Sequence, residues 1–174
     1  RQVGRIVVRG PSLIAGYFDA AEETERVLST DGWLDTGDLG YLADGRLVVT
    51  ERSKDLIIVN GRNLWPQDLQ WTVEAELAAT RSGDVAVISV DDGAGEEVVA
   101  LVQCRASEPA AREALAQDVA NLLRSRHGIA ARVVLVPPRS LPQTSSGKLS
   151  RSRARMMHLA GDFSSPALAA DAAG

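Results

Sequence analysis

Residues 85–136 read VAVISVDDGAGEEVVALVQCRASEPAAREALAQDVANLLRSRHGIAARVVLV, and their hydrophobic pattern changes from strand-like to helix-like and back. Apolar, mainly β-branched residues fill Val85–Val90 and Glu97–Cys104, which predicts two strands. The acidic and glycine-rich segment 91–95 between them predicts the turn that joins the strands.

A helix is expected next, from about residue 108 to residue 127. Its predicted buried stripe repeats at helical spacing and consists of Ala111, Leu115, Val119, Leu122 and Leu123. Ser107 is the expected N-cap, and Gly128 ends the pattern. A third strand follows at Val133–Val136, so this part of the chain predicts an α+β unit.

The same unit extends in both directions. Upstream, Pro66 opens a helix with apolar residues at every fourth position. Downstream, a polar loop leads to a basic helix at about 149–160. We therefore expect a compact α+β domain over 53–160, in which a small mixed sheet is flanked by helices, followed by a flexible tail at 161–174.

Residues 1–52 form a different, strand-rich strip that is too short for a core of its own. A strand is expected near 5–9 and a helix near 20–28. Asp44-Gly45 between two apolar segments predicts a hairpin, and Asp55–Val59 predicts a further strand that ends at the turn dipeptide Asn60-Gly61. The strip is interpreted as the end of a larger N-terminal domain.

Composition excludes several classes of protein. The net charge of −4 and pI near 5.2 argue against nucleic acid as a partner. No apolar stretch reaches the roughly 20 residues of a membrane span. The single cysteine, Cys104, lies in an expected strand and is interpreted as a core residue, and the two histidines lack neighbours at metal-ligand spacing. A cytoplasmic protein without a metal site is expected.

Three segments contain more polar residues and glycines than folding requires. In Gly32–Gly40, glycines flank Asp38, whose carboxylate could accept both hydroxyls of a ribose; a capped turn is the alternative that spacing alone favours. The charged segment 51–68 has the composition of a solvated linker. In 141–151, Lys148 stands alone in a Ser/Gly loop that lacks the second glycine and the hydroxyl residue of a phosphate-binding P-loop.

Together, these segments resemble the C-terminal third of an adenylate-forming enzyme, the superfamily of acyl-CoA synthetases, luciferases and peptide-synthetase adenylation domains. The resemblance runs from Gly4 to about Arg155 and rests on motifs in a fixed order, which are Gly10-Pro11-Ser12, Gly16-Tyr17, Gly32-Trp33, Thr36-Gly37-Asp38, Arg52, Lys54-Asp55, Gly61, Pro66 and Ser146-Gly147-Lys148. The segment 54–68 is most similar to fatty-acyl-AMP ligases and long-chain fatty-acyl-CoA ligases.

The resemblance implies roles for five residues. Asp38 would bind the ribose hydroxyls of ATP, assisted by Arg52. Lys54 would lie at the hinge about which the C-terminal domain rotates between half-reactions. Lys148 would contact the carboxylate and the α-phosphate during adenylation, and Gly61 would lie on the path of the acceptor thiol. These assignments are implied by the family and not by spacing.

The implied reaction joins a fatty acid to AMP, with release of pyrophosphate, and passes the acyl group to the phosphopantetheine thiol of an acyl carrier protein or coenzyme A. ATP and Mg²⁺ would be required, with the metal ligands, phosphate loop and acyl pocket upstream of Arg1 in the chain's own N-terminal domain. The chain alone is therefore expected to be inactive. Glu51 and Gln70 depart from the family pattern. The alternative is a non-catalytic domain for carrier-protein docking or assembly.

Overall fold

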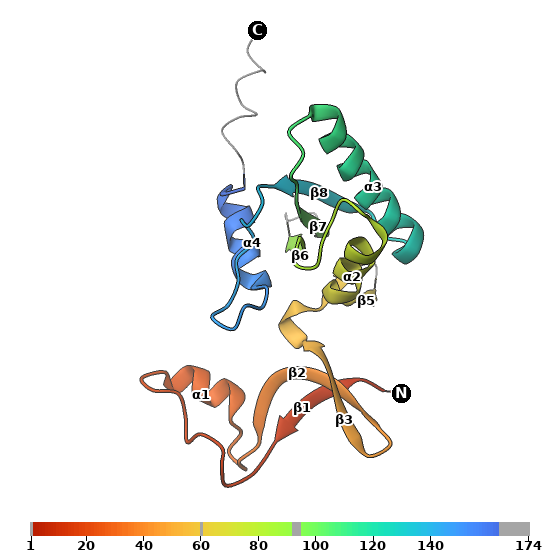
Figure 1. Cartoon of the computed structure of the whole chain (residues 1–174). Helices are drawn as coiled ribbons and strands as arrows, with labels where there is room; N and C mark the ends of the chain where they lie inside the picture. The colour runs from red at the N-terminus through yellow and green to blue at the C-terminus, as the bar shows by residue number, and fades with distance from the viewer. Residues whose placement is uncertain (1, 60, 92–94, 164–174) are drawn as a thin grey trace. The chain divides into compact units, whose positions relative to one another are not determined.

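The computed structural model describes residues 2–59, 61–91 and 95–163, which form two compact units, Arg1–Leu56 and Ile57–Gly174 (Figure 1). The expected domain boundary between residues 52 and 53 stays a prediction. Asn60, residues 92–94 and the end of the expected tail, 164–174, lie outside the described residues.

The first unit is a three-stranded antiparallel sheet in the order β1-β2-β3, with one short helix. Its elements are β1 (Gly4–Val8), α1 (Ala21–Val27), β2 (Leu34–Ala43), β3 (Arg46–Arg52) and the 3-10 turn η1 (Ser53–Asp55). The strand, helix and Asp44-Gly45 hairpin expected from sequence are present; the strand expected at Asp55–Val59 begins only at Ile57, because η1 occupies the residues before it.

The second unit contains a two-stranded sheet and a mixed three-stranded sheet. Its elements are β4 (Ile57–Val59), β5 (Arg62–Leu64), α2 (Pro66–Glu76), β6 (Val85–Asp91), β7 (Glu96–Gln103), α3 (Pro109–His127), β8 (Ala131–Val136) and α4 (Arg151–Ala160). In the order β6-β7-β8, β6 pairs antiparallel and β8 pairs parallel with the central β7, and α3 makes the crossover between the parallel strands. The predicted α+β unit with a small mixed sheet flanked by helices is confirmed.

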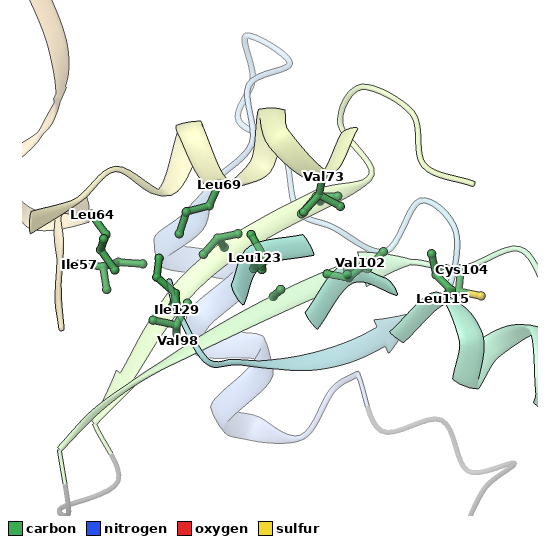
Figure 2. Packing of buried hydrophobic residues seen from close by; sticks show 14 residues of the cluster. Ile57, Leu64, Leu69, Val73, Val98, Val102, Cys104, Leu115, Leu123 and Ile129 are labelled. Atoms are coloured by element: carbon green, nitrogen blue, oxygen red, sulfur yellow. The ribbon is translucent and has the colours of Figure 1, made fainter. Parts of the chain in front are cut away.

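Side chains of the central strands point alternately to the two faces of the sheet, and each face packs into its own hydrophobic core. One face of the sheet packs Val98 and Val102 of β7 against Leu69 and Val73 of α2 and against α3, as Figure 2 shows. The other face packs Leu101 and its neighbours against α4. Because successive strand residues point to opposite faces, a strand covered on both sides is apolar throughout. This explains why β6 and β7 read as continuous hydrophobic runs.

Two details of α3 differ from expectation. Its N-cap is Glu108, without a side-chain cap hydrogen bond, because Pro109 occupies the first helical position and leaves Ser107 one residue too early. Ala111 is exposed, whereas Leu115, Val119 and Leu123 are buried as expected. Cys104 is buried in the core, as predicted.

A buried carboxylate closes one end of the mixed sheet. Asp84, 3% exposed, accepts two hydrogen bonds from the Arg105 guanidinium, at 2.6 and 2.9 Å, and one from the Arg81 main-chain N–H. These hydrogen bonds, led by those from Arg105, hold the pKa of Asp84 below its ordinary value of 3.8. Burial of Asp84 acts in the opposite direction. The pKa of the Glu74 carboxyl is raised, mainly by its own burial.

Asp84→Asn should lower the stability of the chain at neutral pH, and this deficit should shrink in acid. A carboxylate with a depressed pKa contributes stability that is present above its unfolded-state pKa, 3.8, and is lost as the pH falls through the folded-state value. Urea unfolding at neutral pH and at about pH 3 measures the effect, with Asp118→Asn, an exposed position on α3, as control. An equal deficit at both pH values would contradict the prediction.

None of the helices in the described part of the chain combines the length and apolarity that crossing a membrane requires.

Candidate functional site

Asp38 lies in a bulge of β2. Between the pairs Arg5↔Leu39 and Val7↔Asp35, three residues of β2 stand opposite one residue of β1, so the register shifts there. Bulges bend a strand and redirect a side chain that regular pairing would constrain. Asp38 therefore belongs to a strand and not to a turn, and the irregularity lies within the sheet.

Glycines and one hydroxyl shape this bulge. Gly37 has φ +73°, which glycine adopts without strain, and a Cβ on Gly40 would lie 2.5 Å from the Val48 carbonyl oxygen. The Thr36 hydroxyl donates to the Ile6 carbonyl at 2.9 Å and accepts the Asp38 N–H at 3.1 Å. Thr36 thereby joins the main chain at Asp38 to β1, a role that sequence reasoning did not assign.

The structure brings Asp38 and Arg52 together. They are register partners across β2 and β3, and Nε of Arg52 lies 3.3 Å from Oδ1 of Asp38. The two side chains are 31% and 56% exposed respectively, so both remain accessible to a ligand. An exposed ion pair of this kind contributes little to folding. A carboxylate held beside a cation at a sheet surface is instead suited to accept hydrogen bonds from a ligand's hydroxyl groups.

Lys54 lies in the 3-10 turn η1, directly after β3. The residues on both sides of this turn are extended, with φ −79° and ψ 138° at Arg52 and φ −64° and ψ 128° at Leu56. The two compact units divide between Leu56 and Ile57, two residues after Lys54. The main chain thus makes its last turn of the first unit at Lys54.

Gly61 lies between β4 and β5, which pair antiparallel through Val59↔Arg62. Its φ of +72° is the conformation that a tight hairpin turn requires. A Cβ at Gly61 would meet no heavy atom of the described chain within 4 Å, so the main chain is open on that side. Below the turn, Ile57 and Leu64 are buried in the core and hold the hairpin to the second unit.

Lys148 lies in a small hydrogen-bonded hairpin and not in an irregular loop. Gln143 and Leu149 form an antiparallel bridge, and within it the Thr144 N–H donates to the Lys148 carbonyl at 2.7 Å. The Gly147 N–H donates to the Thr144 carbonyl at 2.9 Å, and Gly147 has φ +76°. A turn closed by a left-handed glycine is a common solution for three-residue hairpin loops.

Thr144 contacts the main chain of Lys148 on both sides. Besides the bond from its N–H, its hydroxyl oxygen accepts the Lys148 N–H at 3.2 Å. Leu141 is buried and Leu149 packs against the same core, while Lys148 itself is exposed. The hairpin therefore presents one ammonium group from a backbone that is held in place. The sequence signal for Thr144 is weak, because hydroxyl residues are common in any polar loop.

The predicted site residues fall in both units. Asp38, Arg52 and Lys54 lie in the first, and Gly61 and Lys148 lie in the second. Among the contacts described for these residues, the ion pair between Asp38 and Arg52 is the one that joins two predicted site residues. Among the described residues, no three His, Cys, Asp or Glu side chains are grouped so that they could hold a metal ion.

Comparison with known proteins gives a consistent result. A candidate acyl-CoA synthetase of Caulobacter vibrioides is 55% identical over 163 residues, which cover 94% of this chain and 28% of that protein. A medium-chain-fatty-acid–[acyl-carrier-protein] ligase of Moorena producens is 35% identical over 170 residues, covering 92% and 29%. No protein-family model matches the chain.

A solved structure supports the same relationship. The chain superimposes with a TM-score of 0.79 and 43% identity on a structure from a study of fatty acyl-adenylate ligases of E. coli and L. pneumophila, covering 94% of this chain and 28% of that one. The chain thus spans less than a third of the length of these relatives. By sequence and by fold, the chain is similar to the C-terminal part of adenylate-forming enzymes.

Proposed function

We propose that the protein containing this chain activates a fatty acid with ATP, forming acyl-AMP and pyrophosphate, and then transfers the acyl group to a phosphopantetheine thiol. The observation that carries the proposal is the Lys148 hairpin, in which Thr144 holds the main chain while the ammonium group stays exposed. Attack of a carboxylate on the α-phosphate needs no covalent enzyme intermediate. The protein contributes position and charge, which a preorganised cation supplies.

Each residue has a separate task in this proposal. Lys148 stabilises the negative charge that develops between carboxylate and α-phosphate. Asp38 accepts the ribose hydroxyls of ATP, and Arg52 orients its carboxylate through their ion pair. The open side of the Gly61 turn gives the thiol arm a path along the main chain. Lys54 is the hinge that lets Lys148 leave after the first step.

The requirement for Mg²⁺ fits only in part. The described residues offer no cluster of metal ligands, so a metal ion that neutralises ATP phosphates would be held by residues outside them. The proposal includes the thiol acceptor, which is a carrier protein or coenzyme A. It also includes a cytoplasmic location. Names of relatives include both a fatty-acid–[acyl-carrier-protein] ligase and an acyl-CoA synthetase.

The direct test is pyrophosphate exchange by the full-length protein. With MgATP, labelled pyrophosphate and a series of fatty acids, label should enter ATP only when a fatty acid is present. Exchange with amino acids but not with fatty acids would contradict the substrate class. No exchange with any acid, together with retained binding of a carrier protein, would favour the docking domain.

Asp38→Ala should weaken ATP binding by the full-length protein by roughly 10- to 100-fold, since hydrogen bonds to a charged group contribute about 1.5–3 kcal/mol. Calorimetric titration with ATP measures the affinity. Arg5→Met is the control, because it breaks another ion pair of the same sheet, Arg5–Asp35 at 2.6 Å. A lower melting temperature with unchanged ATP affinity would reduce Asp38 to a structural residue.

A further inference from the structure

Gln70 of α2 is a buried polar side chain that the proposed chemistry does not use. It is 7% exposed, and both ends of its amide are bonded. Nε2 donates to the Val85 carbonyl at 2.8 Å, and Oε1 accepts from Nε and Nη2 of Arg151 at 2.9 and 2.7 Å. One side chain thus connects helix α2, strand β6 and the first residue of helix α4.

Arg151 lies three residues beyond Lys148, at the base of the hairpin. The residue before it, Ser150, donates its N–H to the Pro142 carbonyl at 2.9 Å. The next residue inward, Leu149, forms the bridge with Gln143. The guanidinium therefore anchors the point at which the returning strand of the hairpin enters α4.

The amide suits this place better than a carboxylate of the same length. A glutamate would accept both N–H groups of Arg151 but could not donate to the Val85 carbonyl, which would lose a buried partner. A leucine would lose both contacts. A comparison of Gln, Glu and Leu at position 70 therefore distinguishes the effect of the bond to Arg151 from the effect of the bond to β6.

We propose that Gln70 and Arg151 are positioning residues that fix the base of the Lys148 hairpin and thereby set where the ammonium group lies during adenylation. The inference rests on the proposed function of Lys148. Neither residue contacts the reacting atoms in this account. They act on the reaction indirectly: Gln70 holds Arg151, Arg151 holds the base of the hairpin, and the hairpin positions Lys148. Small displacements of a positioned catalytic group cost up to about 100-fold in rate.

The experiment uses Arg151→Met, Gln70→Leu and Gln70→Glu in the full-length protein, with Arg155→Met as the matched control at an exposed position of α4. Hydrogen exchange of the amides of Thr144, Gly147, Lys148 and Ser150 reports on the hairpin without reference to activity. Adenylation and transfer from supplied acyl-adenylate are measured separately.

We expect Arg151→Met and Gln70→Leu to speed exchange of the hairpin amides. The same two variants should lower kcat for adenylation by about 10- to 100-fold, with KM for ATP and the transfer step nearly unchanged. Gln70→Glu, which keeps the bond to Arg151, should retain hairpin protection and most of the adenylation rate. Arg155→Met should match the wild type in every measurement.

Two results would overturn the proposal. One is wild-type hairpin exchange and adenylation in Arg151→Met. The other is an equal loss of both half-reactions with faster exchange throughout the second unit, which would mean a general structural role. If the wild type itself shows no adenylation, the proposed function fails, while faster exchange confined to the hairpin would still establish the Gln70–Arg151 anchor.

Discussion

Lys148→Ala in the full-length protein should reduce acyl-adenylate formation by roughly 100- to 1,000-fold and leave transfer from supplied acyl-adenylate largely intact. Losing one preorganised donor at the developing charge of a transition state costs about 3–4 kcal/mol. In the proposed cycle this charge develops only in the first half-reaction. In the same proposal, rotation of the second unit removes the hairpin before the thiol attacks.

The structure indicates that this substitution removes the ammonium group without disturbing the hairpin. The contacts that hold the hairpin use the main chain of Lys148 and the side chain of Thr144, and alanine preserves them. The lysine side chain is exposed, so its removal creates no cavity. The melting temperature should therefore stay at the wild-type value. Pyrophosphate exchange reports the first step, and thioester formation from synthetic acyl-AMP reports the second.

Arg155→Ala provides the control, because it removes a cation from an exposed position of the adjacent helix α4. If the effect of Lys148→Ala arose from net charge alone, both variants would lower adenylation equally. That outcome, or an equal fall of both half-reactions in Lys148→Ala, would refute the assigned role.

Lys54→Pro should impair thiol transfer far more than adenylation. Proline fixes φ, removes the amide donor and disfavours the helical conformation of the preceding residue, Ser53, which lies in η1. The second backbone arrangement that the proposed hinge requires would therefore be restricted. A conformation disfavoured by about 3 kcal/mol loses roughly 100-fold in population. The transfer rate, measured from supplied acyl-AMP, should fall by a similar factor.

Lys54→Ala is the matched control, since it removes the ammonium group and keeps the freedom of φ and ψ. Its transfer rate should remain close to that of the wild type. A large defect in Lys54→Ala would show that the side chain, not the backbone, is used. Equal impairment of both half-reactions by Lys54→Pro would argue against a hinge at this position.

Local patterns were sufficient for the longer helices and strands of the second unit. The apolar runs of β6 and β7, the helical repeat of α3 and the Pro66 start of α2 are each encoded within one segment. The short strand β5 is not predictable from the sequence, because three residues carry no periodicity. Its strand conformation depends on pairing with β4 and on burial of Leu64. The cap of α3 was misplaced by one residue for a local reason, the position of Pro109.

The sequence by itself was enough to propose the site residues, because ordered motifs mark Asp38, Arg52, Lys54, Gly61 and Lys148. Only the tertiary structure decided how such groups are held. The bulge that presents Asp38 depends on a hydrogen bond to β1, thirty residues away, and the Gln70–Arg151 bond joins side chains 81 positions apart. Contacts of this separation form only when the chain folds, because no local pattern of hydrophobicity or turn residues specifies which distant donor meets which acceptor.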